Sequence, residues 1–248
     1  MLRAACLFLV AMAAGCGSDM PASPTPADGS RPLRVLMLTA TTGFRHDSIA
    51  TARQVLASLA AQTGEFVVTP TESLADISTV RLASIDVLMF ALTSGELPLS
   101  NAGRQALLDF VDRGGGFVGV HSASDTLHEW PSYVALVGAS FKEHPWTQEA
   151  TVTVEAPTHP AAARLGSSFR LTEEFYTFQE NPRPRVQVVL SLDPSSVGAQ
   201  GDFPLAWAQT IGRGRSFYTA LGHFDSTWTD PRFQSHIRGA IAWAGGRE

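Results

Sequence analysis

The sequence predicts an α/β fold, with a mainly parallel sheet flanked by helices and an antiparallel extension near the C-terminus. Short, almost continuously apolar runs alternate with amphipathic segments between residues 33 and 137. This alternation is typical of parallel strands that are buried on both faces and joined by helices. Beyond residue 140 the alternation weakens, and a glycine at 212 suits a hairpin turn between two late strands. With 248 residues, the chain can bury a full core in one large domain.

The first half of the chain predicts four strands and the helices between them. The strands share short apolar runs that end in polar turns, and they cover residues 33–39, 66–70, 85–92 and the apolar part of 114–126. The helices share apolar residues at helical spacing, and they cover residues 49–61, 100–112 and 130–137, with a short amphipathic segment over 74–82. Asp47 or Ser48 is suited to cap the first of these helices.

The second half predicts further strands and a closing helix. The strand candidates cover residues 150–154, 175–178, 186–190, 205–209 and 215–221. The turn at Gly212 makes the last two an antiparallel pair. Apolar residues at helical spacing then predict a helix over residues 231–244.

The N-terminus predicts a lipoprotein-type signal peptide over residues 1–15, with Cys16 as the lipidated residue. An apolar run follows Arg3 and ends in small residues, although Ala13 stands where such signals usually carry leucine. Plain secretion and an apolar start that is no signal are the alternatives. Residues 16–32 are rich in Ser, Pro, Gly and Asp, as expected of a flexible linker, and residues 33–248 form the folded domain. We therefore expect a lipid-anchored protein of the bacterial cell envelope, on its periplasmic or extracellular face.

Cysteine content and charge exclude several classes of function. The only cysteines are Cys6 and Cys16, so the domain has no thiol nucleophile, disulfide or cysteine-bound zinc. The formal net charge is −5 and no basic stripe is visible, which argues against a nucleic-acid partner. We expect the membrane to be contacted through the lipid anchor alone. The oligomeric state stays open.

Polar residues cluster directly after the predicted strands. Thr42 and His46 follow the first strand, His121 and Ser122 follow the fourth, and His223 follows the last. The carboxyl ends of parallel strands share one edge of a sheet, where open α/β folds bind their ligands. Histidines that meet there are suited to proton transfer or to holding a metal.

Several separated motifs, in this order, resemble the ThuA-like family, which is named for trehalose utilisation. The resemblance spans residues 34–244. The motifs are Thr42-Gly43-Phe44-Arg45-His46 with Ser48, Gly114-Gly115-Gly116-Phe117-Val118-Gly119-Val120-His121, Phe141 with His144-Pro145, His159-Pro160, Glu173-Glu174 before Tyr176, Pro204 with Trp207, and Gly212-Arg213-Gly214-Arg215 leading to Leu221-Gly222-His223. The resemblance implies a flavodoxin-like fold similar to that of class I glutamine amidotransferases.

The amidotransferase comparison bears directly on His121. Those enzymes place a cysteine at the centre of a Gly-x-Cys-x-Gly elbow, and this chain has Gly119 and Ala123 on either side of His121. Imidazole suits a general base or a ligand better than an acyl-forming nucleophile, so we expect no glutaminase activity. The segment Val120-His121-Ser122-Ala123-Ser124 resembles the Gly-His-Ser-x-Gly motif of lipases but lacks both of its glycines. Because the strained turn of that motif needs these glycines, Ser122 is disfavoured as a nucleophile.

Further candidates come from the family motifs and from aromatic residues. His144 precedes a proline that favours an extended backbone in a projecting loop, whereas His159 is equally suited to fixing a turn. Glu173 and Glu174 face opposite ways on a strand, and we expect Glu174, two residues before Tyr176, to enter the site. Rings that could stack on a sugar are those of Trp130, Tyr176 and Trp228.

Two functions follow. The first is an enzyme acting on a carbohydrate, such as a keto sugar or glycoside, with His46, His121 and Glu174 as catalytic residues and Thr42, Ser122, His144 and His223 among those that bind substrate. A divalent metal such as zinc, held by some of the histidines, is an alternative to simple acid–base chemistry. The second function is a lipid-anchored, non-catalytic glycan-binding or accessory module, and a protein-interaction scaffold is a weaker third.

Overall fold

The computed structural model describes Met1 and residues 31–247, so the predicted signal peptide, Cys16 and nearly all of the predicted linker lie outside the described residues. The strands are β1 (Leu33–Leu38), β2 (Phe66–Thr71), β3 (Val87–Ala91), β4 (Gly116–Val120), β5 (Phe141–Val154), β6 (Ser168–Phe178), β7 (Gln187–Leu192), β8 (Pro204–Ile211) and β9 (Gly214–Thr219). The helices are α1 (Ile49–Thr63), α2 (Thr79–Leu82), α3 (Asn101–Asp112), α4 (Pro131–Val137), α5 (Asp225–Thr229) and α6 (Pro231–Ala244), and the short 3-10 helices are η1 (Leu74–Asp76), η2 (His121–Asp125) and η3 (Pro194–Val197).

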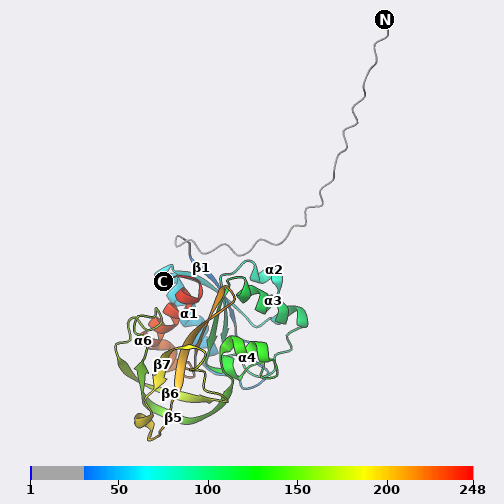
Figure 1. The fold of residues 1–248 in the computed structure, drawn as a ribbon. Helices are drawn as coiled ribbons and strands as arrows, with labels where there is room; N and C mark the ends of the chain where they lie inside the picture. Colours follow the sequence, from blue (N-terminus) through cyan, green and yellow to red (C-terminus); the bar gives the residue numbers. More distant parts are fainter. Residues whose placement is uncertain (2–30, 248) are drawn as a thin grey trace.

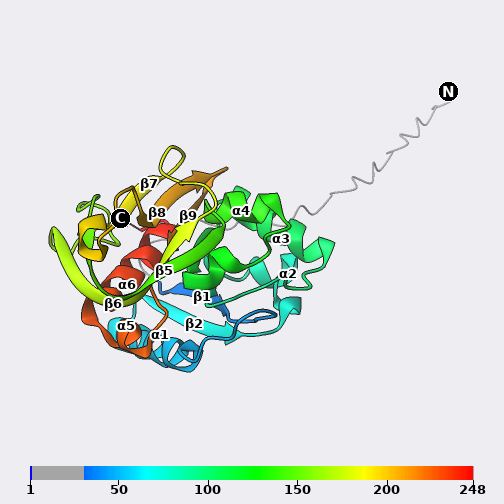
Figure 2. The ribbon, with the colours of Figure 1, turned by 90° about the horizontal axis from the view of Figure 1, so that it is seen from below.

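These strands join one mixed sheet in the order β2-β1-β3-β4-β9-β8-β7-β5-β6. The strands from β2 to β9 in this order are parallel, and each later neighbour pairs antiparallel, so the predicted fold class is confirmed. Helices α1, α5 and α6 lie on one face of the parallel part, and α2, α3 and α4 lie on the other (Figure 1, Figure 2). The central strands β3 and β4 are buried along their whole length, as their apolar sequences predict.

The helix ends follow from local chemistry. Ser100 caps α3 by accepting a hydrogen bond from the backbone N–H of Gly103. Asp230 caps α6 in the same way, and Pro231 stands at its first turn. Helix α1 ends at Gly64, whose φ of 65° is the left-handed conformation that favours glycine.

The antiparallel half departs from the prediction at β5. The loop expected around His144 and Pro145 is instead the first part of this strand, which begins at Phe141 and pairs with β6. The pairing is interrupted by register shifts between Phe141 and Glu143 and between Glu143 and Trp146. Bulges of this kind tolerate a proline, which cannot donate to a regular ladder. Figure 2 shows β5 and β6 curving beside α5 and α6.

No helix among the described residues is long and apolar enough to span a membrane.

Candidate functional site

The site is built on a sharp turn between β4 and η2, with His121 at its centre. The backbone of His121 has a φ of 53°, in the left-handed region that residues with a side chain seldom adopt. Small neighbours are required, because a Cβ atom at Gly119 would lie 3.1 Å from Cδ2 of Tyr218 and 3.3 Å from Cβ of Ala123. The hydroxyl of Tyr218 donates to the carbonyl of His121 at 2.8 Å. The strand therefore ends in a sharp turn with the imidazole of His121 at its centre.

Hydrogen bonds fix the orientation of the His121 ring, which is fully buried. Its Nδ1 lies 2.6 Å from the carbonyl oxygen of Ala220, just after β9, and must donate to it. In the neutral ring Nε2 then carries the lone pair, and it accepts from the hydroxyl of Tyr176 at 2.9 Å. Nε2 also lies 3.2 Å from Nδ1 of His223.

His46 comes from the loop after β1 and packs edge-on against the other two imidazoles. Its ring centroid lies 4.8 Å from that of His121 and 5.1 Å from that of His223. Burial, followed by electrostatic interactions with His121 and His223, lowers the pKa of His46 to about 3. Its Nδ1 is 3.5 Å from the hydroxyl of Ser122, which is itself buried. An imidazole of such low pKa is a weak base for activating a serine.

The backbone of His223 is held in place by the carboxylate of Glu173 on β6. Glu173 is fully buried and accepts from the backbone N–H groups of Gly222 at 2.9 Å and His223 at 3.1 Å. It also accepts from the hydroxyl of Thr227 at 2.8 Å. Ser48 supports the same loop by donating to the carbonyl of Gly222 at 3.4 Å instead of capping α1 with its side chain.

Glu174 faces the opposite way from Glu173 and enters the histidine cluster. Its Oε2 lies 3.1 Å from Nδ1 of His223 and 3.5 Å from Nε2 of His121, and its Oε1 lies 3.3 Å from Nδ1 of His144. Burial raises the pKa of Glu174, but its contacts with the imidazoles of His121 and His223 outweigh burial and hold the pKa well below its usual range. The hydrogen bond to Glu174, opposed by burial, raises the pKa of His223.

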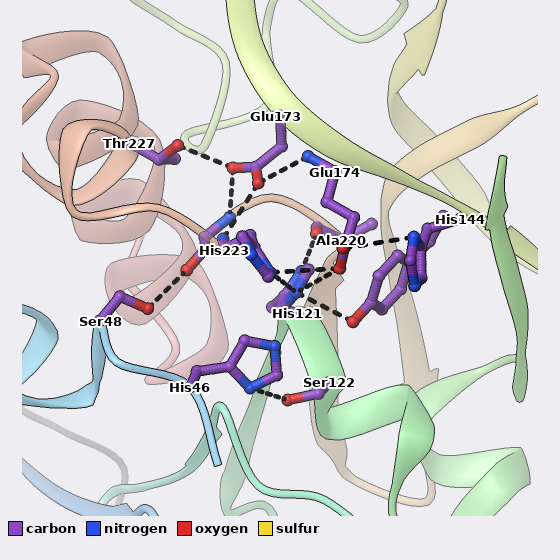
Figure 3. A network of polar contacts seen from close by, with 12 residues as sticks. His46, Ser48, His121, Ser122, His144, Glu173, Glu174, Ala220, His223 and Thr227 are labelled. Carbon is purple, nitrogen blue, oxygen red and sulfur yellow. Dashed lines mark hydrogen bonds and ion pairs between the residues drawn. The ribbon is translucent and has the colours of Figure 1, made fainter. Parts of the chain in front are cut away.

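The structure thus brings together four potential metal ligands from four separate parts of the chain, as Figure 3 shows. One ligand atom from each of His46, His121, Glu174 and His223 lies within 4.8 Å of the others. We call these four residues the histidine cluster. It lies at the carboxyl ends of the parallel strands, where the sequence predicts it.

Other predicted site residues lie around the cluster. The ring of Tyr176 packs on His121 with centroids 4.3 Å apart, and burial raises the pKa of Tyr176 well above its usual value. The side chain of His144 is 47% exposed, and its ring stacks on Phe141 and lies 3.3 Å from Glu174. Thr42 is exposed, and its backbone N–H donates to the carbonyl of Ser94.

None of the three predicted aromatic residues presents a free face. Tyr176 is 4% exposed and packs against His121 and Phe141. Trp228 has no exposed surface, and its indole N–H donates to the carbonyl of Gly222 at 2.8 Å, so it supports the His223 loop. Trp130 is 9% exposed and lies between Tyr133 and the guanidinium of Arg104. His159 fixes a turn by accepting from the backbone N–H of Ala161 and is not part of the cluster.

Sequence reasoning missed two contributions to the site. Glu173 was expected to stay outside it, yet this carboxylate orients the loop that carries His223. Phe44, which is 65% exposed, packs edge-on against His46 with centroids 4.8 Å apart. An apolar ring next to a polar motif was the available signal for Phe44.

Comparison with known proteins identifies relatives along nearly the whole domain. The family model described as trehalose utilisation (ThuA) matches residues 34–244. A ThuA-like protein from Bacteroides uniformis ATCC 8492 is 25% identical, covering 89% of this chain and 95% of its own, with a TM-score of 0.71. A ThuA-like protein from Parabacteroides merdae ATCC 43184 is 17% identical, covering 87% of this chain and 91% of its own, with a TM-score of 0.72.

A more distant structure shares the fold. It is that of a GMP synthase component from Thermoplasma acidophilum, which is 13% identical and covers 86% of this chain and 94% of its own, with a TM-score of 0.53. No curated protein matches the sequence.

Proposed function

The chain belongs to the trehalose-utilisation (ThuA) family, and we propose that it is an enzyme acting on a carbohydrate that carries a keto group, as a free keto sugar or a keto-glycoside. The observation that carries the proposal is the convergence of His46, His121, Glu174 and His223 at the end of the parallel sheet. A carbon next to a sugar ketone has an acidic proton, so isomerisation or elimination needs a positioned base and a group that stabilises the developing oxyanion, but no nucleophile.

The turn at His121 favours acid–base chemistry next to a ketone over acyl transfer. The place of the nucleophile is taken by His121, and both cysteines of the chain precede the domain. Ser122 is buried, and its hydroxyl lies 3.5 Å from Nδ1 of His46. We therefore propose that the enzyme has no glutaminase activity, and release of ammonia from glutamine by the purified protein would contradict this.

Aromatic side chains beside the histidine cluster favour a sugar as substrate. Phe44 offers an exposed ring directly beside His46. Phe141 and His144 stack on the other side, with ring centroids 6.0 Å apart. Flat apolar rings match the apolar face of a pyranose, and the imidazole of His144 supplies a polar group for a hydroxyl. In this arrangement Phe44 takes the stacking role that the sequence suggested for Trp228.

The proposal is tested by incubating the purified domain with a panel of keto-glycosides and keto sugars and identifying products by NMR. We expect at least one substrate to be consumed, and we expect His121→Asn to abolish its turnover. Equal turnover by the wild type and this variant would contradict the assignment. If calorimetry detects binding of a sugar but no product forms, the chain is instead the non-catalytic glycan-binding module.

We also propose that the protein is anchored to the cell envelope through a lipid on Cys16. The N-terminal sequence supports this, and so does the entry point of the chain into the domain. Arg31 pairs with Asp86 at 2.7 Å next to the amino ends of β1 and β3, whereas the cluster lies at the carboxyl ends of the parallel strands. A tether at residue 31 therefore leaves the site open to solutes. Metabolic labelling with palmitate should mark the wild type and not a Cys16→Ser variant.

A further inference from the structure

We infer that the histidine cluster binds one divalent transition-metal ion, with zinc as the best match, through His46, His121, His223 and Glu174. The inference deepens the proposed function, and its meaning for a sugar ketone rests on that function. Metal binding itself is measured without any substrate. Three nitrogen donors and one carboxylate form a set that zinc and its neighbours in the first transition row prefer in proteins.

Three of the four ligand atoms already have the spacing of a tetrahedral site. Nε2 of His121 lies 3.2 Å from Nδ1 of His223. Oε2 of Glu174 lies 3.1 Å from Nδ1 of His223 and 3.5 Å from Nε2 of His121. Bonds of about 2.0–2.1 Å to a tetrahedral zinc ion separate the ligand atoms by roughly 3.3–3.4 Å. The three atoms therefore have the spacing of one face of a tetrahedron.

His46 supplies the remaining donor. Its ligand atom lies within 4.8 Å of the other three. Figure 3 shows the His46 ring beside His121 and His223, with the nitrogen nearest Ser122 directed away from both of them. The second ring nitrogen is thus left for the cluster.

A hydrogen bond to a residue outside the cluster determines which ring nitrogen of His121 carries the lone pair. Its Nδ1 donates to the carbonyl of Ala220 at 2.6 Å, so Nε2 faces the cluster without a hydrogen. A metal-binding histidine usually has this arrangement, because the outer hydrogen bond selects the tautomer and fixes the ring. The hydroxyl of Tyr176 donates to this lone pair at 2.9 Å, and a bound metal ion would replace that hydrogen bond.

The ligands on the other side of the cluster are supported equally well. Glu173 holds the backbone of His223 and the hydroxyl of Thr227, and no part of this carboxylate is exposed. His144 contacts the second oxygen of Glu174 from a position half exposed at the rim. A metal held by these four residues would polarise a substrate carbonyl by accepting it as a fifth ligand, and His144, an imidazole outside the ligand set, would be placed for proton transfer.

The experiment strips the purified wild type with a chelator, reloads it with zinc sulfate and removes free ion by gel filtration. Bound zinc is then measured by elemental mass spectrometry, affinity by competition with a chromogenic chelator, and ligand geometry by the visible spectrum after cobalt substitution. Glu174→Gln preserves the size of a partly exposed side chain, and His223→Ala removes a nitrogen donor. His128→Ala is the matched control, since this imidazole is bound to Asp125 and Ser140 outside the cluster.

We expect one zinc ion per chain in the wild type and in His128→Ala, and an affinity reduced by at least about tenfold in the other two variants. Circular dichroism of the metal-free proteins verifies that each variant is folded, and if His223→Ala unfolds, Glu174→Gln decides. The inference is overturned if the wild type retains no stoichiometric zinc, or if all four proteins bind it alike. Keto-glycoside turnover by a wild type that binds no stoichiometric zinc would overturn the metal site while leaving the proposed function standing. Stoichiometric zinc without turnover of any sugar would support the metal site and contradict the proposed function.

Discussion

Glu173 and Thr227 are joined by a hydrogen bond of 2.8 Å from the threonine hydroxyl to Oε2 of the carboxylate, in the buried interior behind the histidine cluster. The same carboxylate accepts from the backbone N–H groups of Gly222, His223 and Glu174. One side chain on β6 therefore fixes the loop that carries His223. The position of His223 depends on Glu173, although Glu173 does not belong to the cluster.

Glu173→Gln should reduce both stability and metal affinity. The side-chain NH2 group of glutamine would face N–H and O–H groups that now donate to Glu173, so some of these buried donors would lose their acceptor. We therefore expect the free energy of unfolding to decrease by about 1–3 kcal/mol. Zinc affinity should fall by roughly 10–100-fold. Urea unfolding and chelator competition measure the two effects. Glu143→Gln, at an exposed carboxylate paired with Lys142, is the control and should leave both unchanged. Zinc affinity equal to that of the wild type would refute the positioning role of Glu173.

His121→Asn should leave the fold intact while turnover of a keto-glycoside falls by roughly 10²–10⁴-fold. Asparagine tolerates the left-handed backbone that His121 adopts, which alanine accommodates less well. The comparison variant is His128→Asn, which removes an imidazole outside the cluster. Steady-state kinetics and thermal unfolding are measured on both. If the two variants lose activity to the same extent, His121 has no special role.

Phe44→Ala should raise KM for the sugar and leave the free energy of unfolding within about 0.5 kcal/mol of the wild type. The Phe44 ring is 65% exposed, so it contributes little to the core but offers a stacking face beside His46. Val80→Ala, at an 87% exposed side chain on α2, is the matched control. An unchanged KM in Phe44→Ala would remove Phe44 from the substrate site.

Stability should decrease as the pH falls below about 6.5, in part because of His236. Burial lowers the pKa of His236 from 6.5 to about 4, so below pH 6.5 the unfolded chain binds a proton that the native protein excludes. This contribution is complete above pH 6.5 and is lost as the pH falls through 4. It amounts to about 3 kcal/mol.

Urea unfolding of the wild type and of His236→Gln, measured between pH 7 and pH 4, tests this contribution. Glutamine still donates to the carbonyl of Ala161, which His236 Nδ1 contacts at 2.8 Å, but it does not titrate. The free energy of unfolding of the variant should therefore fall less steeply. Parallel curves for the two proteins would show that His236 is not the group responsible.

The parallel half of the fold was predictable because its strands are buried on both faces and its helices are amphipathic. Strand β3 is apolar throughout, and α3 repeats apolar residues at helical spacing after a serine cap. The first residues of β5 were not predictable as a strand, because exposed polar residues and Pro145 occupy a bulged segment. Helix α5 spans five residues and is too short to show a period.

The candidate site was predictable where it depends on strand ends. The carboxyl ends of β1, β4 and β9 bring His46, His121 and His223 together, as parallel topology requires. The choice between Glu173 and Glu174 followed from strand alternation, which places the two side chains on opposite faces. Alternation alone did not reveal that the face of β6 that carries Glu173 packs against the loop before α5. Glu173 therefore accepts hydrogen bonds from Gly222 and Thr227 and holds this loop in place. Burial of Trp228 likewise depends on tertiary packing that a single sequence does not display.

The central claim is that the histidine cluster activates the proton next to a sugar ketone. The most direct test is to incubate a keto-glycoside with the enzyme in deuterium oxide and to follow by NMR the exchange of hydrogen on the carbons beside the carbonyl. The account predicts exchange, with or without further reaction, at a rate well above that in buffer for the wild type, and exchange at the buffer rate for His121→Asn. Exchange at the buffer rate with the wild type for every keto sugar tested, or equal exchange by both proteins, would contradict it.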